Sequence, residues 1–206
     1  MPNYVYSKLQ VIGNEKDINE IHDYVVNQEN FIYDLLPLPK EATTLIGGMS
    51  IFATVINDGV DGYQMAVKLW GSKWVTVEDV YAKFNLQSTC NFVIDLESAW
   101  SSPIAAIKKI SKIYPNLIFI MASIEEQPCF AFVSAYHNGE VIDTKDCYET
   151  FIPSVSWEEN EQLADEEFNE YLEKITEKMS DKKNEYLVYF DELNLLTHEN
   201  NQEIFY

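Results

Sequence analysis

Hydrophobic and polar positions alternate at the start of the chain and then change period. Alternation over residues 4–12 predicts a first strand. Asn14 then precedes apolar residues at helical spacing, Ile18, Ile21 and Val25, and so predicts a capped amphipathic helix. We therefore expect the chain to open with a strand followed by a helix.

The middle of the chain breaks this regularity. Residues 40–75 hold five of the seven glycines beside a helix-compatible stretch over 63–69, which predicts an irregular insert. Two strands are then predicted over 80–86 and 89–96, and apolar and polar residues alternate strictly in the second. The tandem strands argue against a doubly wound dinucleotide fold, which needs a helix between successive strands.

A second helix is predicted after these strands. Ser102 is the predicted N-cap, and Pro103 occupies the first helical position. Ile104, Ile107 and Ile110 fall on one face, so this helix is also expected to pack on a sheet.

The next segment predicts a buried strand and a hairpin. Residues 117–124 are almost continuously apolar, and the segments 129–136 and 140–143 flank Asn138-Gly139, which favours a type I′ turn. With the insert set aside, the order is strand, helix, two strands, helix, strand and hairpin. This is the pattern of an α+β ferredoxin-like antiparallel sheet with two helices on one face, extended by extra strands.

The sequence changes character in its last quarter. Turning residues 157–179 by 100° per residue gathers apolar side chains on one arc and glutamates on the opposite arc, which predicts an amphipathic acidic helix. We therefore divide the chain into a ferredoxin-like domain over 1–150, with the insert 40–75, and an acidic helical extension over 151–206 packed on it. The apolar arc is Trp157, Ala164, Phe168, Tyr171, Leu172, Ile175 and Met179, and the glutamate row is Glu159, Glu166, Glu170, Glu173 and Glu177.

Charge narrows the class of partner. The chain has 34 Asp and Glu against 14 Lys and no Arg, for a formal charge of −20. Residues 156–206 alone hold 15 Asp and Glu against 4 Lys. Such a surface repels phosphates and lacks the guanidinium groups that commonly bind them. We therefore do not expect direct nucleic-acid binding, and we expect a basic protein partner.

Known catalytic and metal-binding motifs are absent from the sequence. It has no phosphate-binding glycine loop and no HExxH motif, its three histidines are scattered, and its three cysteines lack CxxC spacing. We therefore expect no metal and no cofactor, and interpret the cysteines as buried thiols. Adjacent carboxylates on a predicted exposed helix do not provide the contrast of environments that a catalytic pair needs.

One group of residues is a candidate ligand pocket. Asp95 and Glu97 end an apolar strand just before Trp100, and Trp70 and Trp74 add aromatic surface. Aromatic core is the alternative interpretation of these tryptophans.

Targeting signals are not apparent. The first residues lack a charged leader followed by an apolar run, and the longest apolar stretches, such as 117–122, are far shorter than the ~20 residues that span a bilayer. We expect a protein of the bacterial cytoplasm that does not enter the membrane.

Three short blocks carry a family resemblance. Met1-Pro2-Asn3-Tyr4, Trp70-Gly71-Ser72-Lys73-Trp74 and Ser98-Ala99-Trp100-Ser101-Ser102-Pro103 resemble, in this order, the YubB-type ferredoxin-like proteins of phages and plasmids. The match covers about residues 1–145 and leaves out the acidic extension. The resemblance implies a ferredoxin-like fold and a mobile-element origin, but no agreed activity and no catalytic residues.

The glutamate row supports the leading functional hypothesis. A solvated helix face is its ordinary interpretation, but like charges at i and i+4 cost roughly 0.2–0.5 kcal/mol each and only Lys174 and Lys178 relieve them. We therefore expect a non-enzymatic anti-defence protein that inhibits a host nuclease, such as a CRISPR-Cas or restriction effector, by mimicking nucleic acid. Two alternatives remain open: a small-ligand or nucleotide-binding module that uses the aromatic insert, and an enzyme that uses Asp95, Glu97 and a histidine.

Overall fold

The fold is that of a computed structural model of the chain. It describes residues 3–28, 30–46, 49–52, 62–86, 89–126 and 129–148. In the last quarter it describes helical residues 162–163, 166–171, 173–174, 177–179, 181–182 and 186, which together are called the C-terminal segment below.

The elements follow one another along the chain as a βα unit, a short irregular region and a second run of strands and helices. The first half holds β1 (Tyr4–Asn14), α1 (Glu15–Asn27), α2 (Phe31–Leu35), η1 (Lys40–Ala42), β2 (Thr43–Ile46), β3 (Met49–Phe52) and α3 (Gly62–Trp70). The second half holds β4 (Val75–Leu86), β5 (Thr89–Ala99), α4 (Ile104–Ile113), β6 (Ile118–Glu125), β7 (Ala131–His137) and β8 (Glu140–Asp146).

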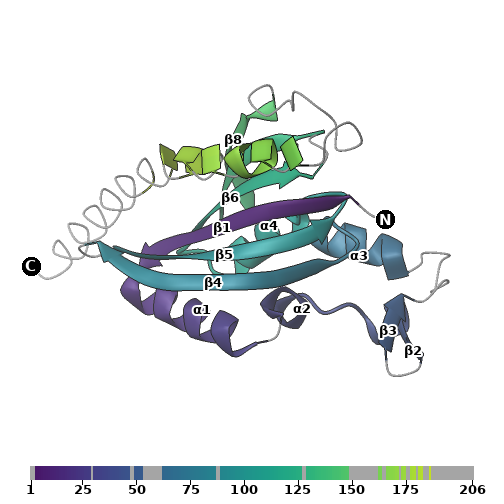
Figure 1. The fold of residues 1–206 in the computed structure, drawn as a ribbon. Coiled ribbons are helices and arrows are strands. Elements are labelled where there is room, and N and C mark those ends of the chain that lie inside the picture. Colours follow the sequence, from purple (N-terminus) through teal and green to yellow (C-terminus); the bar gives the residue numbers. More distant parts are fainter. Residues whose placement is uncertain are drawn as a thin grey trace, which may run out of the picture.

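Six strands form one antiparallel sheet in the order β4-β5-β1-β6-β7-β8 (Figure 1). The four strands β4, β5, β1 and β6, with α1 and α4 as connections, have the ferredoxin-like arrangement, in which each helix joins two strands that flank a third. The hairpin β7–β8 extends the sheet beyond β6. The predicted α+β ferredoxin-like fold is thus confirmed.

Local signals set several element ends. The Asn14 side chain accepts the Asp17 N–H at 3.0 Å and caps α1, whose residues Ile18 and Ile21 are buried, as predicted. Asn138 and Gly139 both have positive φ, 48° and 84°, so the β7–β8 turn has the predicted type I′ character.

The predicted irregular insert is more regular than its glycines indicate. Residues 40–75 contain η1, the hairpin β2–β3, α3 and the first residue of β4, while 47–48 and 53–61 lie outside the described residues. The strand expected from residue 80 begins at Val75, where α2 holds it: the Asn30 side-chain amide donates to the Val75 carbonyl at 2.6 Å and the Val75 N–H donates to the Tyr33 hydroxyl at 3.0 Å.

The predicted cap of the second helix is wrong. Pro103 is itself the N-cap of α4, with no side-chain cap bond, and the helix begins at Ile104. The Ser102 carbonyl accepts the Ile104 N–H at 2.8 Å, and its buried hydroxyl has no hydrogen-bond partner among the described residues. The chain enters α4 through a tight backbone turn that directs this hydroxyl into the interior.

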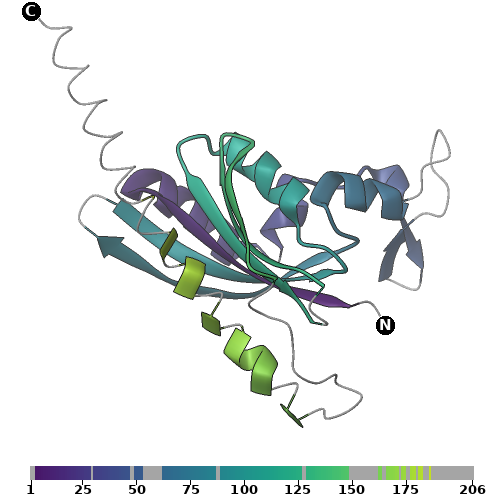
Figure 2. The same ribbon diagram turned by 90° about the horizontal axis from the view of Figure 1, so that it is seen from above.

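The sheet carries an apolar layer on each face. Helices α1 to α4 cover one face, called the helical face, through residues such as Leu9, Phe92 and Ile107. On the opposite face, called the second face, lies the C-terminal segment (Figures 1 and 2). Ile120 and its neighbours form an apolar cluster with residues of this segment. Within the described ranges, none of the helices has the length and apolar character that crossing a membrane requires.

Candidate functional site on the second face of the sheet

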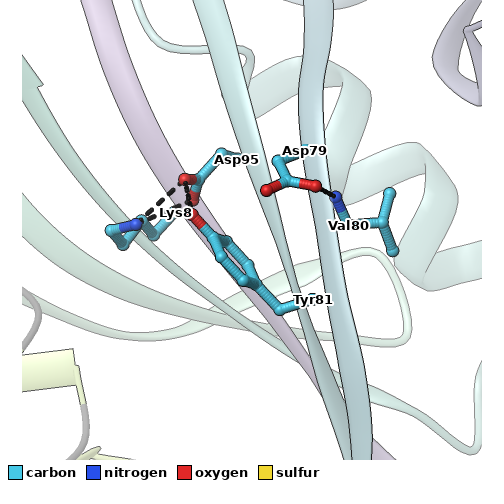
Figure 3. A network of polar contacts seen from close by, with 5 residues as sticks. All are labelled: Lys8, Asp79, Val80, Tyr81 and Asp95. Carbon is cyan, nitrogen blue, oxygen red and sulfur yellow. Dashed lines mark hydrogen bonds and ion pairs between the residues drawn. The ribbon is translucent and has the colours of Figure 1, made fainter.

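A satisfied polar network occupies the middle of the second face. Lys8 of β1 lies directly opposite Asp95 of β5, and its Nζ donates to both carboxylate oxygens, at 2.9 and 3.0 Å. The Tyr81 hydroxyl of β4 donates to Asp95 Oδ2 at 2.6 Å, and Lys8 Nζ lies 5.2 Å from the centroid of the same ring (Figure 3). Both oxygens of Asp95 are therefore engaged, which leaves this carboxylate poorly placed to act as a free general base.

The Tyr81 hydroxyl is held in its protonated form by this network. Its hydrogen bond to Asp95, together with burial and the negative charge of that carboxylate, raises the pKa of Tyr81 to about 12. At neutral pH the hydroxyl is consequently a permanent donor.

A pocket of about 280 Å³ lies beside this network. Its wall comes from four adjacent strands, because side chains of one face lie side by side across a sheet. The lining residues are Tyr6, Ser7, Lys8, Glu78, Asp95, Leu96, Glu97 and Ala122. The pocket thus brings together two of the five predicted pocket residues, Asp95 and Glu97.

Glu97 is a carboxylate of this pocket whose pKa is raised. It lies opposite Tyr6 in the β1–β5 register, and Glu78 approaches it from a bulge in β4 between Val77 and Asp79. Burial, and then the charge and hydrogen bond of Glu78, raise the pKa of Glu97 above its usual value of 4.5. Desolvation and a like-charged neighbour both disfavour the charged form of Glu97.

The described part of the glutamate row faces solvent. Glu166, Glu170, Glu173 and Glu177 are all exposed, whereas Glu159 lies outside the described residues. The row is partly neutralised, because Lys174 Nζ lies 2.6 Å from Glu170 Oε1.

The C-terminal segment is fixed to the second face by its apolar side. Tyr171 and Met179 are 8% and 3% exposed in the apolar layer of this face. The rings of Phe168 and Tyr6 meet edge to face with centroids 5.4 Å apart, and Lys182 pairs with Asp143 of β8. The glutamates consequently project from a helix that the sheet orients, and Tyr6 belongs both to the pocket wall and to this contact.

The three tryptophans predicted to line the pocket, Trp70, Trp74 and Trp100, do not gather around it. Trp70 is 4% exposed, stacks on Tyr33 with centroids 4.4 Å apart and donates its ring N–H to the Leu36 carbonyl at 2.8 Å. It belongs to the core on the helical face, so its ring is not free to stack on a ligand. The ring of Trp74 contacts the ring of Tyr4 edge to face, with centroids 5.7 Å apart.

Trp100 is the exposed member of the three. It is 45% exposed and has a positive φ of 61°. The ring centroids of Trp100 and Tyr63 lie 6.2 Å apart, and Lys73 Nζ lies 5.4 Å from the centroid of the Trp100 ring. These residues form a small surface group apart from the pocket, so the five predicted pocket residues are divided among four places.

Two of the sequence blocks that carry the family resemblance, residues 70–74 and 98–103, lie in contact. The Ser101 hydroxyl donates to the Gly71 carbonyl at 2.6 Å, and the Ser72 hydroxyl donates to the Ala99 carbonyl at 2.8 Å. Gly71 has a φ of 89°, and a Cβ on it would lie 3.1 Å from the Ser102 carbonyl oxygen. These blocks therefore join the α3–β4 and β5–α4 connections and act as structural residues.

Sequence reasoning missed Tyr6, Lys8, Glu78 and Tyr81. Alternation in the first strand placed Tyr6 and Lys8 on one face, but pairing them with Glu97 and Asp95 required the strand order and register. No signal in the sequence indicated the bulge that brings Glu78 into the pocket.

The thiols and histidines add no second site. Cys147 is buried as expected, whereas Cys129 is exposed because it lies in the β6–β7 connection, so the prediction of a buried thiol is wrong there. No group of three His, Cys, Asp or Glu side chains within the described residues could hold a metal ion.

A family model matches the middle of the chain. Residues 78–167 match the family described as the ferredoxin-like domain in Api92-like protein. The crystal structure of a protein api92 from Yersinia pseudotuberculosis is 9% identical, covers 71% of this chain and 98% of its own, and superposes with a TM-score of 0.49. No curated protein matches the chain. The matched residues and the observed strand order together identify a ferredoxin-like domain, similar to the one in Api92-like protein.

Proposed function

We propose that this chain is a non-enzymatic binding protein for a basic partner and that it presents its acidic second face to that partner. The partner we propose is a host nuclease such as a CRISPR-Cas or restriction effector, whose nucleic-acid channel would accept carboxylates in place of phosphates. The narrower resemblance to YubB-type proteins, with its mobile-element origin, belongs to this proposal and supplies the setting in which such an inhibitor acts.

The observation that carries the proposal is the orientation of the C-terminal segment. Its apolar side chains Tyr171 and Met179 are buried on the sheet, while Glu166, Glu173 and Glu177 are exposed on the same helical turns. A helix held in this way presents its charges in a fixed row, which lowers the entropy lost when a partner binds.

Electrostatics would determine how such a complex forms. A charge of −20 on a chain of 206 residues attracts a basic surface over roughly one Debye length, about 8 Å at physiological ionic strength. We therefore expect fast association that slows as salt is added.

The test is affinity capture from a bacterial lysate, with mass spectrometry of what is retained. The wild-type chain is compared with the variant E166K/E170K/E173K, whose three substitutions reverse the row. A second variant, E20K/D23K/E140K, changes the net charge equally at exposed positions outside the second face. The captured protein is then assayed for nucleic-acid cleavage in the presence of each chain.

The expected result is a basic nucleic-acid-binding protein that is retained and inhibited by the wild type and by E20K/D23K/E140K, but not by E166K/E170K/E173K. Retention of no basic protein would contradict the proposal. Equal loss of inhibition in the two variants would also contradict it, since net charge and not the row would then be responsible, and full inhibition by E166K/E170K/E173K would show that the row is not needed.

A further inference from the structure

The pocket on the second face contains two carboxylates without a cation. Glu78 is exposed and Glu97 half-buried, and no ion pair joins either of them to a cation in the described part of the chain. The neighbouring Lys8 is already bound by Asp95 at 2.9 Å. Glu78 and Glu97 hydrogen bond to each other and so share a proton, and no cation of the described residues balances the negative charge that remains on this pair.

The shape and size of the pocket limit what it could hold. Ligand sites for drug-sized molecules and cofactors are roughly 300–1,000 Å³. At about 280 Å³, this pocket suits one side chain better than a nucleotide, and its carboxylates would repel a phosphate.

One wall of the pocket is aromatic. Tyr6 lies opposite Glu97 across β1 and β5, and Phe168 of the C-terminal segment contacts its ring. A flat cation that reaches the two glutamates would lie near this ring, where stacking and cation–π attraction favour guanidinium over ammonium. Guanidinium also offers several coplanar N–H donors, which can serve two carboxylates at once.

We propose that this pocket receives the guanidinium group of an arginine side chain from the basic partner, with Glu78 and Glu97 as its acceptors and Tyr6 as its stacking surface. The inference rests on the proposed function, because it names the group by which that partner is anchored. Tyr6 connects the two features, since its ring touches the helix that carries the glutamate row.

The test uses the full chain and a single-residue probe, N-acetyl-arginine methylamide, followed by backbone amide NMR shifts. We expect saturable chemical-shift changes at Tyr6, Lys8 and Glu97 with a Kd on the order of 1 mM, because a single side chain makes only a small part of the contacts of a whole interface. The uncharged citrulline analogue should bind at least tenfold more weakly. The lysine analogue should also bind more weakly, because it cannot bridge the carboxylates in a plane.

Two variants separate the pocket from general acidity. E78Q/E97Q should weaken arginine binding at least tenfold, and E78Q alone, at an exposed position, should weaken it without endangering the fold. The control E20Q/E140Q, with the same change in net charge, should leave it unchanged.

Three results would overturn the inference: no saturable shift at the pocket, equal weakening in the control variant, or lysine binding as tight as arginine binding. If the pocket fails these tests while capture still depends on E166K/E170K/E173K, the arginine pocket alone is wrong. If arginine binds as expected while capture fails, the proposed inhibitor function is the part that is wrong.

Discussion

Trp100 adopts a backbone conformation that bulky residues rarely occupy. Its φ is 61°, and its N–H donates to the Asn3 carbonyl at 2.9 Å, which fixes the turn after β5. The side chain is 45% exposed, so packing supplies only part of the compensation.

We predict that Trp100→Gly is more stable than Trp100→Ala by about 1 kcal/mol, although both remove the ring. Glycine adopts positive φ without steric cost, whereas alanine keeps the strain. Urea unfolding of the two variants measures the difference. Equal stabilities would mean that the backbone at this position is not strained.

Glu97 gives the fold a pH dependence. Burial and Glu78 raise its pKa in the folded chain above the usual 4.5. Between the unfolded and the folded pKa, the folded state binds the proton more tightly, so the free energy of unfolding falls as pH rises through that window.

We therefore predict that Glu97→Gln is more stable than the wild type at pH 7 and that its stability changes less with pH above 4.5. Thermal unfolding at a series of pH values measures both effects. Glu20→Gln, the same change at an exposed position, is the control. A loss of stability in E97Q at pH 7 would contradict the assigned direction of the pKa shift.

At single residues, the sequence was most informative where the interaction is local. Asn14 caps α1 through a backbone group only three residues away, so its role could be predicted. Trp70 and Trp100 could not be distinguished, because burial of Trp70 depends on Tyr33 of α2 and on Leu36, the C-cap of that helix, and the sequence does not reveal where α2 lies.

Among the elements, the C-terminal segment depends most on tertiary packing. Its described residues contact the sheet through Phe168, Tyr171 and Met179, and Lys182 adds an ion pair to β8. Short amphipathic helices gain most of their stability from such a buried face.

We predict that Met179→Ala lowers the free energy of unfolding by about 2 kcal/mol, because the thioether side chain is 3% exposed. Asn169→Ala, at an exposed position of the same segment, should have little effect. Urea unfolding followed by far-ultraviolet circular dichroism measures both. Equal unfolding midpoints for the two variants would contradict docking of the segment through its apolar side.

The periodicity of each element was readable from the sequence, but its partners were not. Apolar spacing indicated α1, α4 and the alternation of β5, since these patterns repeat within one segment. The start of β4 at Val75 was missed because Asn30 and Tyr33, more than forty residues earlier, hold it in place.

At the scale of the whole molecule, charge is the dominant property. The formal charge of −20 exceeds what solubility of a small domain requires, and self-repulsion among surface carboxylates opposes the compact state. The ion pairs of the described residues neutralise only a few of these carboxylates, as at Asp95, Asp143 and Glu170. Added salt should therefore stabilise the fold, by screening repulsion that unfolding otherwise relieves.

We predict that raising sodium chloride from about 20 mM to about 500 mM raises the Tm by a few degrees, since 1 kcal/mol corresponds to about 2–4 °C for a chain of this size. In E20K/D23K/E140K, whose net charge is −14, the rise should be smaller, because less repulsion remains to be screened. Sodium sulfate is the control, because it is excluded from the protein surface and stabilises folded proteins in general. That general effect should raise the Tm of the wild type and of the variant equally, whereas screening of charge repulsion should not. If the two chains gain the same Tm in sodium chloride, self-repulsion among surface carboxylates does not limit the stability of this fold.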